Sequence, residues 1–296
     1  MKHLIKLPFI TVIIILLMTV QLFSCQKEVV PAEEVVPAGK QKISLYLNDD
    51  PNFNFTKVLV DIRYVEIKVD TGRAGHHDDD DDDDDDHHGH DNYGQWDTLN
   101  INPGVYDLLR LRNGVDTLLG TGFAWNGHIS KVRLTLGNNN SVWTDSTHSQ
   151  PLGFCDGRPF VYVKINSNTI DTIPGGGIVL HLDFDVKKSI NRRSGNYCLR
   201  PNIRSYSHQR NGEIEGEVRP RAANAHIMVY NATDTLYAIP DYDDDDEEGE
   251  FKIRGIRPGT YSVLYDAVAP YRDTTLHNIM VDADEDTHLP DIRLRQ

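Results

Sequence analysis

Apolar and polar side chains alternate along many short stretches of this chain, and this pattern constrains its fold more than any other feature. In the clearest stretch, every second side chain from Ile178 to Val186 is apolar, and His181, Asp183 and Asp185 lie between them. Successive side chains of a strand point to opposite faces. We therefore expect a strand with one buried apolar face and one polar outer face that carries His181, Asp183 and Asp185.

Shorter alternating stretches recur along the rest of the chain between turn sequences such as Asn113-Gly114 and Asn211-Gly212. Between Tyr64 and Val65 the alternation changes phase, which predicts a bulge or a bend within one strand. One short helix or turn is expected over residues 103–111, where a proline suits the helix start. Regular short strands with dense turns predict an all-β protein of two β-sandwich domains in tandem, at 42–207 and 211–296.

The N-terminus has the pattern of a lipoprotein signal peptide over residues 1–24. Two lysines precede a nearly unbroken apolar run over 9–20, and Leu22-Phe23-Ser24-Cys25 follows. The run is shorter than the roughly 20 residues that a spanning helix needs, and it fits a signal peptide. We expect Cys25 to carry lipid, such as palmitate, as the first residue of the mature protein. An uncleaved anchor helix and a signal cut without lipidation are the alternatives.

Residues 25–41 form the expected lipidated tether, because a segment rich in Pro, Ala, Val and Glu cannot build a core and stays disordered. The residues after the cut, Gln26-Lys27-Glu28, resemble the lysine and acidic tag that sends lipoproteins of Bacteroidota to the cell surface. This resemblance implies a lipid anchor in the outer membrane and surface exposure.

The formal net charge of −15 is concentrated in two acidic runs. Asp78–Asp86 supplies nine carboxylates, and Asp241 with Asp243–Glu248 supplies seven, so the remainder of the chain has a formal net charge of about +1. Lysines and arginines are not clustered in the sequence, which argues against a nucleic-acid partner.

The acidic runs are candidate metal-binding segments. The first lies in an expected loop over residues 74–91, where carboxylates suit Ca²⁺ and the flanking imidazoles suit Zn²⁺, Ni²⁺ or Cu²⁺. Consecutive residues impose no coordination geometry, so two interpretations stay open: a solvated low-complexity loop, or weak calcium binding with no cofactor required. The ligands predicted by the second interpretation are Asp78, Asp80, Asp82, Asp84, Asp86, His88, His90, Asp243, Asp245 and Glu247.

After lipidation of Cys25, the chain retains Cys155 and Cys198. A pair of cysteines in an oxidising compartment favours a disulfide, whereas two isolated thiols are a poor zinc site.

Two segments resemble known families. Residues 211–296 resemble the carboxypeptidase regulatory-like domain, whose superfamily also contains starch-binding-like sandwiches, and this implies carbohydrate binding. The matching residues are 214–218, 225–229 and above all Gly249-Glu250-Phe251-Lys252-Ile253-Arg254-Gly255-Ile256-Arg257-Pro258-Gly259-Thr260-Tyr261. The first unit resembles domain of unknown function 4382, which carries over no catalytic residue. Its matching residues are 43–49, 57–67, 106–109, 129–134, 182–185, 188–190 and 199–204.

The sequence contains no Gly-x-Ser-x-Gly elbow, no His-Glu-x-x-His and no phosphate-binding glycine loop, so we expect no enzyme. The leading hypothesis is a non-catalytic envelope lipoprotein that binds or scaffolds a glycan or an envelope protein. The alternatives are an accessory component of a nutrient-uptake or adhesion assembly, and a hydrolase with an unrecognised site. Several aromatic residues could stack on sugars if exposed. Tyr242 and Tyr271, in loop-like sequence, are the preferred candidates.

Overall fold

The computed structural model describes residues 35–50, 54–70, 94–174, 176–243 and 246–296. Residues Val36–Gln296 form one compact unit, which is almost entirely β-structure. The predictions for the signal peptide, for Cys25, for the aspartate and histidine residues of 74–91 and for Asp245 lie outside the described residues. No helix in the described ranges has the length and hydropathy to span a membrane.

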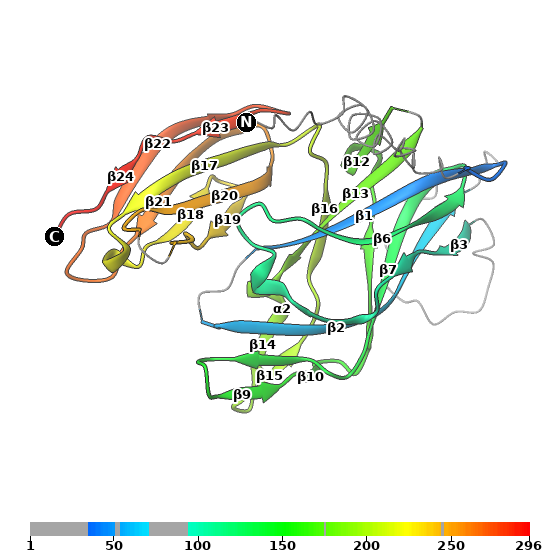
Figure 1. The fold of residues 1–296 in the computed structure, drawn as a ribbon, viewed down its shortest axis with the longest axis horizontal. Helices are drawn as coiled ribbons and strands as arrows, with labels where there is room; N and C mark the ends of the chain where they lie inside the picture. Colours follow the sequence, from blue (N-terminus) through cyan, green and yellow to red (C-terminus); the bar gives the residue numbers. More distant parts are fainter. Residues whose placement is uncertain (1–34, 51–53, 71–93, 175, 244–245) are drawn as a thin grey trace, which may run out of the picture. The chain divides into compact units, whose positions relative to one another are not determined.

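The first sheet has β1 at its centre, between the parallel neighbour β13 and the antiparallel neighbour β6 (Figure 1). β1 begins at Lys40, so the last two residues of the expected tether belong to a strand. The sheet consists of β12 (Ile170–Ile173), β13 (Gly177–Asp185), β1 (Lys40–Asp50), β6 (Thr117–Trp125) and β4 (Asn100–Ile101), with β16 (Ile203–Tyr206) on β13.

The second sheet is built on β2 (Lys57–Asp70), whose 14 residues pair with four other strands. The predicted phase change is confirmed, because the register of β2 against β7 shifts between Ile62 and Tyr64. The bulge keeps apolar residues on the buried face along both halves of the strand. The other strands are β3 (Gly94–Thr98), β5 (Gly104–Asp107), β7 (His128–Leu136), β8 (Ser141–Trp143), β9 (Ser149–Pro151) and β11 (Phe160–Lys164).

Apolar residues of the two sheets form one hydrophobic cluster, with Leu45 of β1 and Val65 of β2 both fully buried. A small third sheet adjoins it, formed by β10 (Gly153–Phe154), β14 (Ile190–Arg193) and β15 (Asn196–Leu199). Within this small sheet region, Cys155 and Cys198 are joined by a disulfide.

The residues from 212 onward form two four-stranded sheets around a separate hydrophobic cluster that includes Ile214, Phe251 and Tyr261. One sheet contains β17 (Gly212–Arg219), β20 (Gly249–Ile256), β23 (Asp286–His288) and β24 (Ile292–Arg293). The other contains β18 (His226–Tyr230), β19 (Thr235–Ala238), β21 (Gly259–Asp266) and β22 (Thr274–Val281).

The short helix or turn expected over residues 103–111 is the 3₁₀ helix Leu108–Arg110, and residues 104–107 form β5, which pairs with β2. One local prediction is wrong. The polar face of β13 is not an outer face: the exposed fractions of His181, Asp183 and Asp185 are 9%, 2% and 4%. β16 pairs with β13 in the same sheet, where Arg204 lies opposite Asp183 and its Nε atom is 2.6 Å from the Asp183 carboxylate. His181 lies 3.6 Å from the Asp171 carboxylate, so these polar side chains are buried with partners.

Candidate functional site

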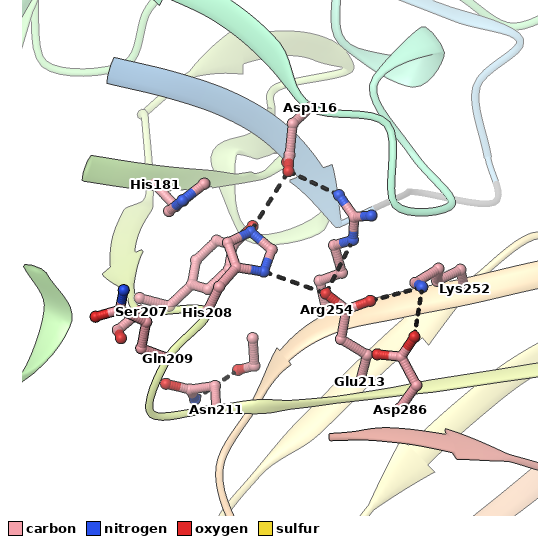
Figure 2. Close-up of polar contacts among 12 residues, drawn as sticks. Asp116, His181, Ser207, His208, Gln209, Asn211, Glu213, Lys252, Arg254 and Asp286 are labelled. Atoms are coloured by element: carbon pink, nitrogen blue, oxygen red, sulfur yellow. Dashed lines mark hydrogen bonds and ion pairs between the residues drawn. The ribbon is translucent and has the colours of Figure 1, made fainter. Parts of the chain in front are cut away.

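The buried polar face of β13 forms part of a cluster of titratable side chains. Asp116, His181 and His208 each offer one ligand atom, and these atoms all lie within 4.8 Å of one another. Asp116 directly precedes β6, His181 lies on β13, and His208 lies in the connection between β16 and β17. We call these three residues the His–Asp cluster. Figure 2 shows how Arg254 and Glu213 adjoin it.

His208 lies between two carboxylates. Its Nδ1 atom is 3.1 Å from Glu213 Oε1, and its Nε2 atom is 3.4 Å from Asp116 Oδ2 (Figure 2). Burial alone lowers the pKa of His208, but the hydrogen bonds to Asp116 and Glu213 outweigh it and raise the pKa to about 9. His208 is therefore an imidazolium at neutral pH.

The same two carboxylates also face cations of β20. Arg254 Nη1 donates a hydrogen bond to Asp116 Oδ2 at 2.7 Å, and Arg254 Nε lies 3.1 Å from Glu213 Oε1. Lys252 Nζ lies 2.7 Å from Glu213 Oε2. Burial raises the pKa of Glu213, but hydrogen bonds from His208 and Lys252 prevail and lower it to about 2. Both carboxylates are therefore ionised, and each faces at least two cations.

His181 has the opposite electrostatic character. Its ring is 4.0 Å from that of His208, between centroids, and stacks on Tyr46 at 5.4 Å. Burial, together with the positive charge of His208, lowers the pKa of His181 to about 4. The imidazole is neutral at pH 7, and its Nδ1 atom is buried without a hydrogen-bond partner among the described residues.

Asp171 of β12 fixes the connection that carries His208. Its carboxylate accepts hydrogen bonds from the Ser207 hydroxyl and from the backbone N–H groups of His208, at 2.8 Å, and Gln209, at 3.3 Å. The Gln209 side chain in turn donates to the Thr172 carbonyl at 2.9 Å. The position of His208 is thus set by the edge strand of the first sheet.

A divalent ion fits this cluster poorly. His181 Nδ1 and Asp116 Oδ1 are buried atoms without hydrogen bonds and have suitable chemistry for Zn²⁺. A third ligand would have to come from His208, whose two nitrogens already face carboxylates, and Arg254 would lie beside the ion. The carboxylate charges are already balanced by protein cations, so we assign no metal to the cluster.

Neither histidine of the cluster has a pKa near neutrality. His208 holds a proton, and the buried His181 takes one up only near pH 4. A base poised near the working pH is what proton-transfer catalysis requires. The paired charges connect Asp116, directly before β6, with His208 in the β16–β17 connection, Glu213 of β17 and Arg254 of β20.

The other predicted site residues that the structure describes lie apart from this cluster. Asp243 and Glu247 are exposed, with no third predicted ligand near them among the described residues. Tyr242 is half-buried under the Arg221 guanidinium, which lies 5.6 Å from its ring. Tyr271 is half-buried against the C-terminal hydrophobic cluster. Neither ring lies open on the surface.

A cavity of about 780 Å³ lies between residues 109–115 and the β17–β20 sheet. Ion pairs line it, with Lys252 Nζ 3.1 Å from Glu215 and Arg112 Nη2 3.6 Å from Asp241. Apolar surface from Phe251 adds to its wall. Most charged side chains of the cavity pair with other residues of the protein, so the cavity does not indicate a particular class of ligand.

Sequence reasoning did not identify Asp116, His208, Glu213 or Arg254 as a group. They are far apart along the chain, and no motif spacing connects them. The only sequence signal for this cluster was the polar face of β13. A strand whose one face is apolar and whose other face carries His and Asp can be covered by protein on both faces.

Residues 40–201, more than half of the chain, match the family model described as Domain of unknown function (DUF4382). No curated protein matches the chain. Among solved structures, the shaft pilin SpaA of Lactobacillus rhamnosus GG is 8% identical, covers 86% of this chain and 97% of its own, and has a TM-score of 0.19. The minor pilin GBS52 of Streptococcus agalactiae is 8% identical, with 86% and 95% covered and a TM-score of 0.20. At these TM-scores, neither pilin structure tells us anything about the function of this chain.

Proposed function

This chain belongs to the DUF4382 family, and we propose the following function for it. It is a non-catalytic lipoprotein of the cell envelope, lipidated at Cys25 and tethered by the segment that follows. Its β-sandwich unit binds or scaffolds a glycan or a protein at the outer membrane. The C-terminal sandwich, with its resemblance to carboxypeptidase regulatory-like domains, is the structural partner of the DUF4382 domain.

The main support for this proposal is that both ring nitrogens of His208 face carboxylates, those of Asp116 and Glu213. A catalytic His and Asp pair would leave a neutral imidazole next to open space for a substrate. Here the imidazole is protonated and lies between Asp116 and Glu213, and Arg254 and Lys252 pair with the same carboxylates. Such a network stabilises one arrangement of the strands, as a rigid binding module requires.

The location is tested by expressing the full chain and a Cys25→Ser variant in a bacterium that processes lipoproteins. We expect the full chain to partition into detergent and to gain the mass of lipid on Cys25, whereas the variant stays in the aqueous phase. Equal masses and equal partitioning of the two proteins would contradict lipid anchoring.

The non-catalytic character is tested on the detergent-solubilised full chain with a panel of glycoside, ester and peptide substrates. We expect no turnover above that of a His208→Gln variant. Turnover that the wild type shows and His208→Gln abolishes would contradict the proposal, provided that both proteins have the same circular dichroism spectrum.

A further inference from the structure

The outward side of the second sheet is an exposed face that the proposed function has not yet used. Across β3, β2, β7 and β11, the buried positions include Val65, Ile67, Val132 and Val163. The side chains between these positions point outward. They include four large aromatic residues and several charged residues. We call this set the outer face: Tyr64, Glu66, Lys68, Asp70, Trp96, Lys131, Arg133, Phe160, Tyr162 and Lys164.

Three lysines form a row across this face. Lys68 lies opposite Lys131, and Lys131 lies opposite Lys164, in the registers of β2 with β7 and of β7 with β11. Within the part of the chain that the structure describes, none of the three forms an ion pair with a carboxylate. Like charges placed directly opposite on neighbouring strands destabilise a sheet. A row of lysines without a carboxylate partner among the described residues is a candidate binding site for an anion.

Aromatic residues lie at one end and along one side of the lysine row. Trp96 lies opposite Lys68, and the Lys131 ammonium is 5.8 Å from the centre of the Tyr162 ring. The exposed fractions are 38% for Trp96, 38% for Tyr162, 36% for Phe160 and 60% for Tyr64. Four large aromatic side chains on one exposed sheet face provide stacking surface for a flat ligand.

The remaining charges of the outer face are mostly paired with one another. Arg133 donates two hydrogen bonds of 2.6 Å to the Glu66 carboxylate, and its guanidinium lies 5.0 Å from the Trp96 ring. Asp70, at the end of β2, is the other carboxylate on this face. With four cations and two anions, the outer face has a formal charge of about +2, while the whole chain has −15.

We propose that the outer face binds an acidic saccharide. Its carboxylate or sulfate groups would pair with Lys68, Lys131 and Lys164, and its sugar rings would stack on Trp96 and Tyr162. We choose an acidic saccharide because its anionic groups suit the lysines and its sugar rings suit the exposed aromatic side chains. A bilayer would have to cover the Arg133–Glu66 pair with lipid, whereas sugar hydroxyls can hydrogen-bond to it.

The test measures binding of polygalacturonate to the detergent-solubilised full chain by calorimetry, with starch as the neutral comparison. An ionic strength of about 0.15 M screens the repulsion from the acidic runs beyond about 8 Å. We expect saturable binding of polygalacturonate and none of starch. The K68Q/K131Q/K164Q variant should bind at least about tenfold more weakly.

Two matched controls separate this site from general effects. The R210Q/R272Q/R295Q variant removes three cations from exposed residues elsewhere and should bind as the wild type does. Trp96→Ala should weaken binding several-fold, whereas Trp125→Ala, which removes a similarly exposed tryptophan from β6, should not. Unchanged circular dichroism would show that each variant is folded.

Other ligands provide the contradicting outcomes. Equal binding of polygalacturonate, poly-glutamate and DNA, without an effect of Trp96→Ala, would reduce the face to a nonspecific cationic surface and overturn the proposal. Binding only to vesicles that contain phosphatidylglycerol would assign the face to a membrane, and no binding at all would also overturn the proposal. This inference rests on the proposed binding function. It can fail while the lipid anchoring and the absence of turnover hold.

Discussion

His181 and His208 have neighbouring rings but opposite pKa shifts, to about 4 and about 9. An ordinary histidine has a pKa near 6.5. Below pH 6.5 the unfolded chain protonates His181 while the folded chain does not, so stability falls as pH falls from about 6.5 to 4. His208 contributes stability that is fully present below about pH 6.5 and is lost as pH rises through about 9.

These opposite shifts predict that the free energy of unfolding is greatest near pH 6.5. Protonation of His181 at acid pH and deprotonation of His208 at alkaline pH should each lower the free energy of unfolding by on the order of 2 kcal/mol, after a discount for the partial exposure of His208. Urea unfolding of a His208→Gln variant should lose the decrease between pH 6.5 and 9, whereas His128→Gln, an exposed residue, should retain it. An alkaline decrease of unchanged size in His208→Gln would contradict the pairing of His208.

Gly255 is a second residue whose role depends on close packing. Its φ is +68°, and a Cβ at this position would lie 2.7 Å from Tyr206 Cδ2. Gly255→Ala should destabilise the protein by roughly 1–3 kcal/mol, through backbone strain and displacement of the buried ring. In Gly153→Ala the new Cβ has no atom within 4 Å, so this control should be nearly neutral. Equal midpoints in urea for all three proteins would rule out this role of Gly255.

At the scale of elements, the connection between β16 and β17 is fixed by β12 through Asp171. Asp171→Ala removes the acceptor of three hydrogen bonds. It should lower the free energy of unfolding by about 1–3 kcal/mol, because the buried Ser207 hydroxyl loses the acceptor of its hydrogen bond. Amide hydrogen exchange of His208 and Gln209 should become faster while exchange in β2 stays the same. Unchanged protection of both amides would show that Asp171 does not fix the connection.

Strand existence could be predicted from the sequence, because alternation reports burial directly. The phase change near Tyr64 even located the bulge in β2. The position of β13 could not be predicted in the same way, because a polar strand face can be solvated or covered by a charged partner such as Arg204. The His–Asp cluster joins residues from three separate parts of the chain, and only the folded arrangement of β6, β13 and the β16–β17 connection brings them together. The outer face could not be predicted, because its residues come from four strands whose pairing the sequence does not give.

For the whole molecule, the Cys155–Cys198 disulfide links residues 43 apart in sequence. A loop of this length should contribute roughly 4 kcal/mol on the chain-entropy model, through the unfolded state. Reductant should lower the urea midpoint of the wild type to that of the C155S/C198S variant, and should not change the variant itself. A wild-type midpoint that stays the same after complete reduction, verified by thiol titration, would contradict this contribution.

We infer that the His–Asp cluster in the described residues is held as a network of paired charges in which His208 is an imidazolium. NMR titration of the histidine Cε1–H resonances, assigned with His181→Gln and His208→Gln, measures the two pKa values. We expect His208 to titrate near pH 9 and His181 near pH 4. If His208 instead titrates near 6.5, a neutral imidazole lies beside Asp116 at physiological pH, and the charge pairing of His208 is contradicted.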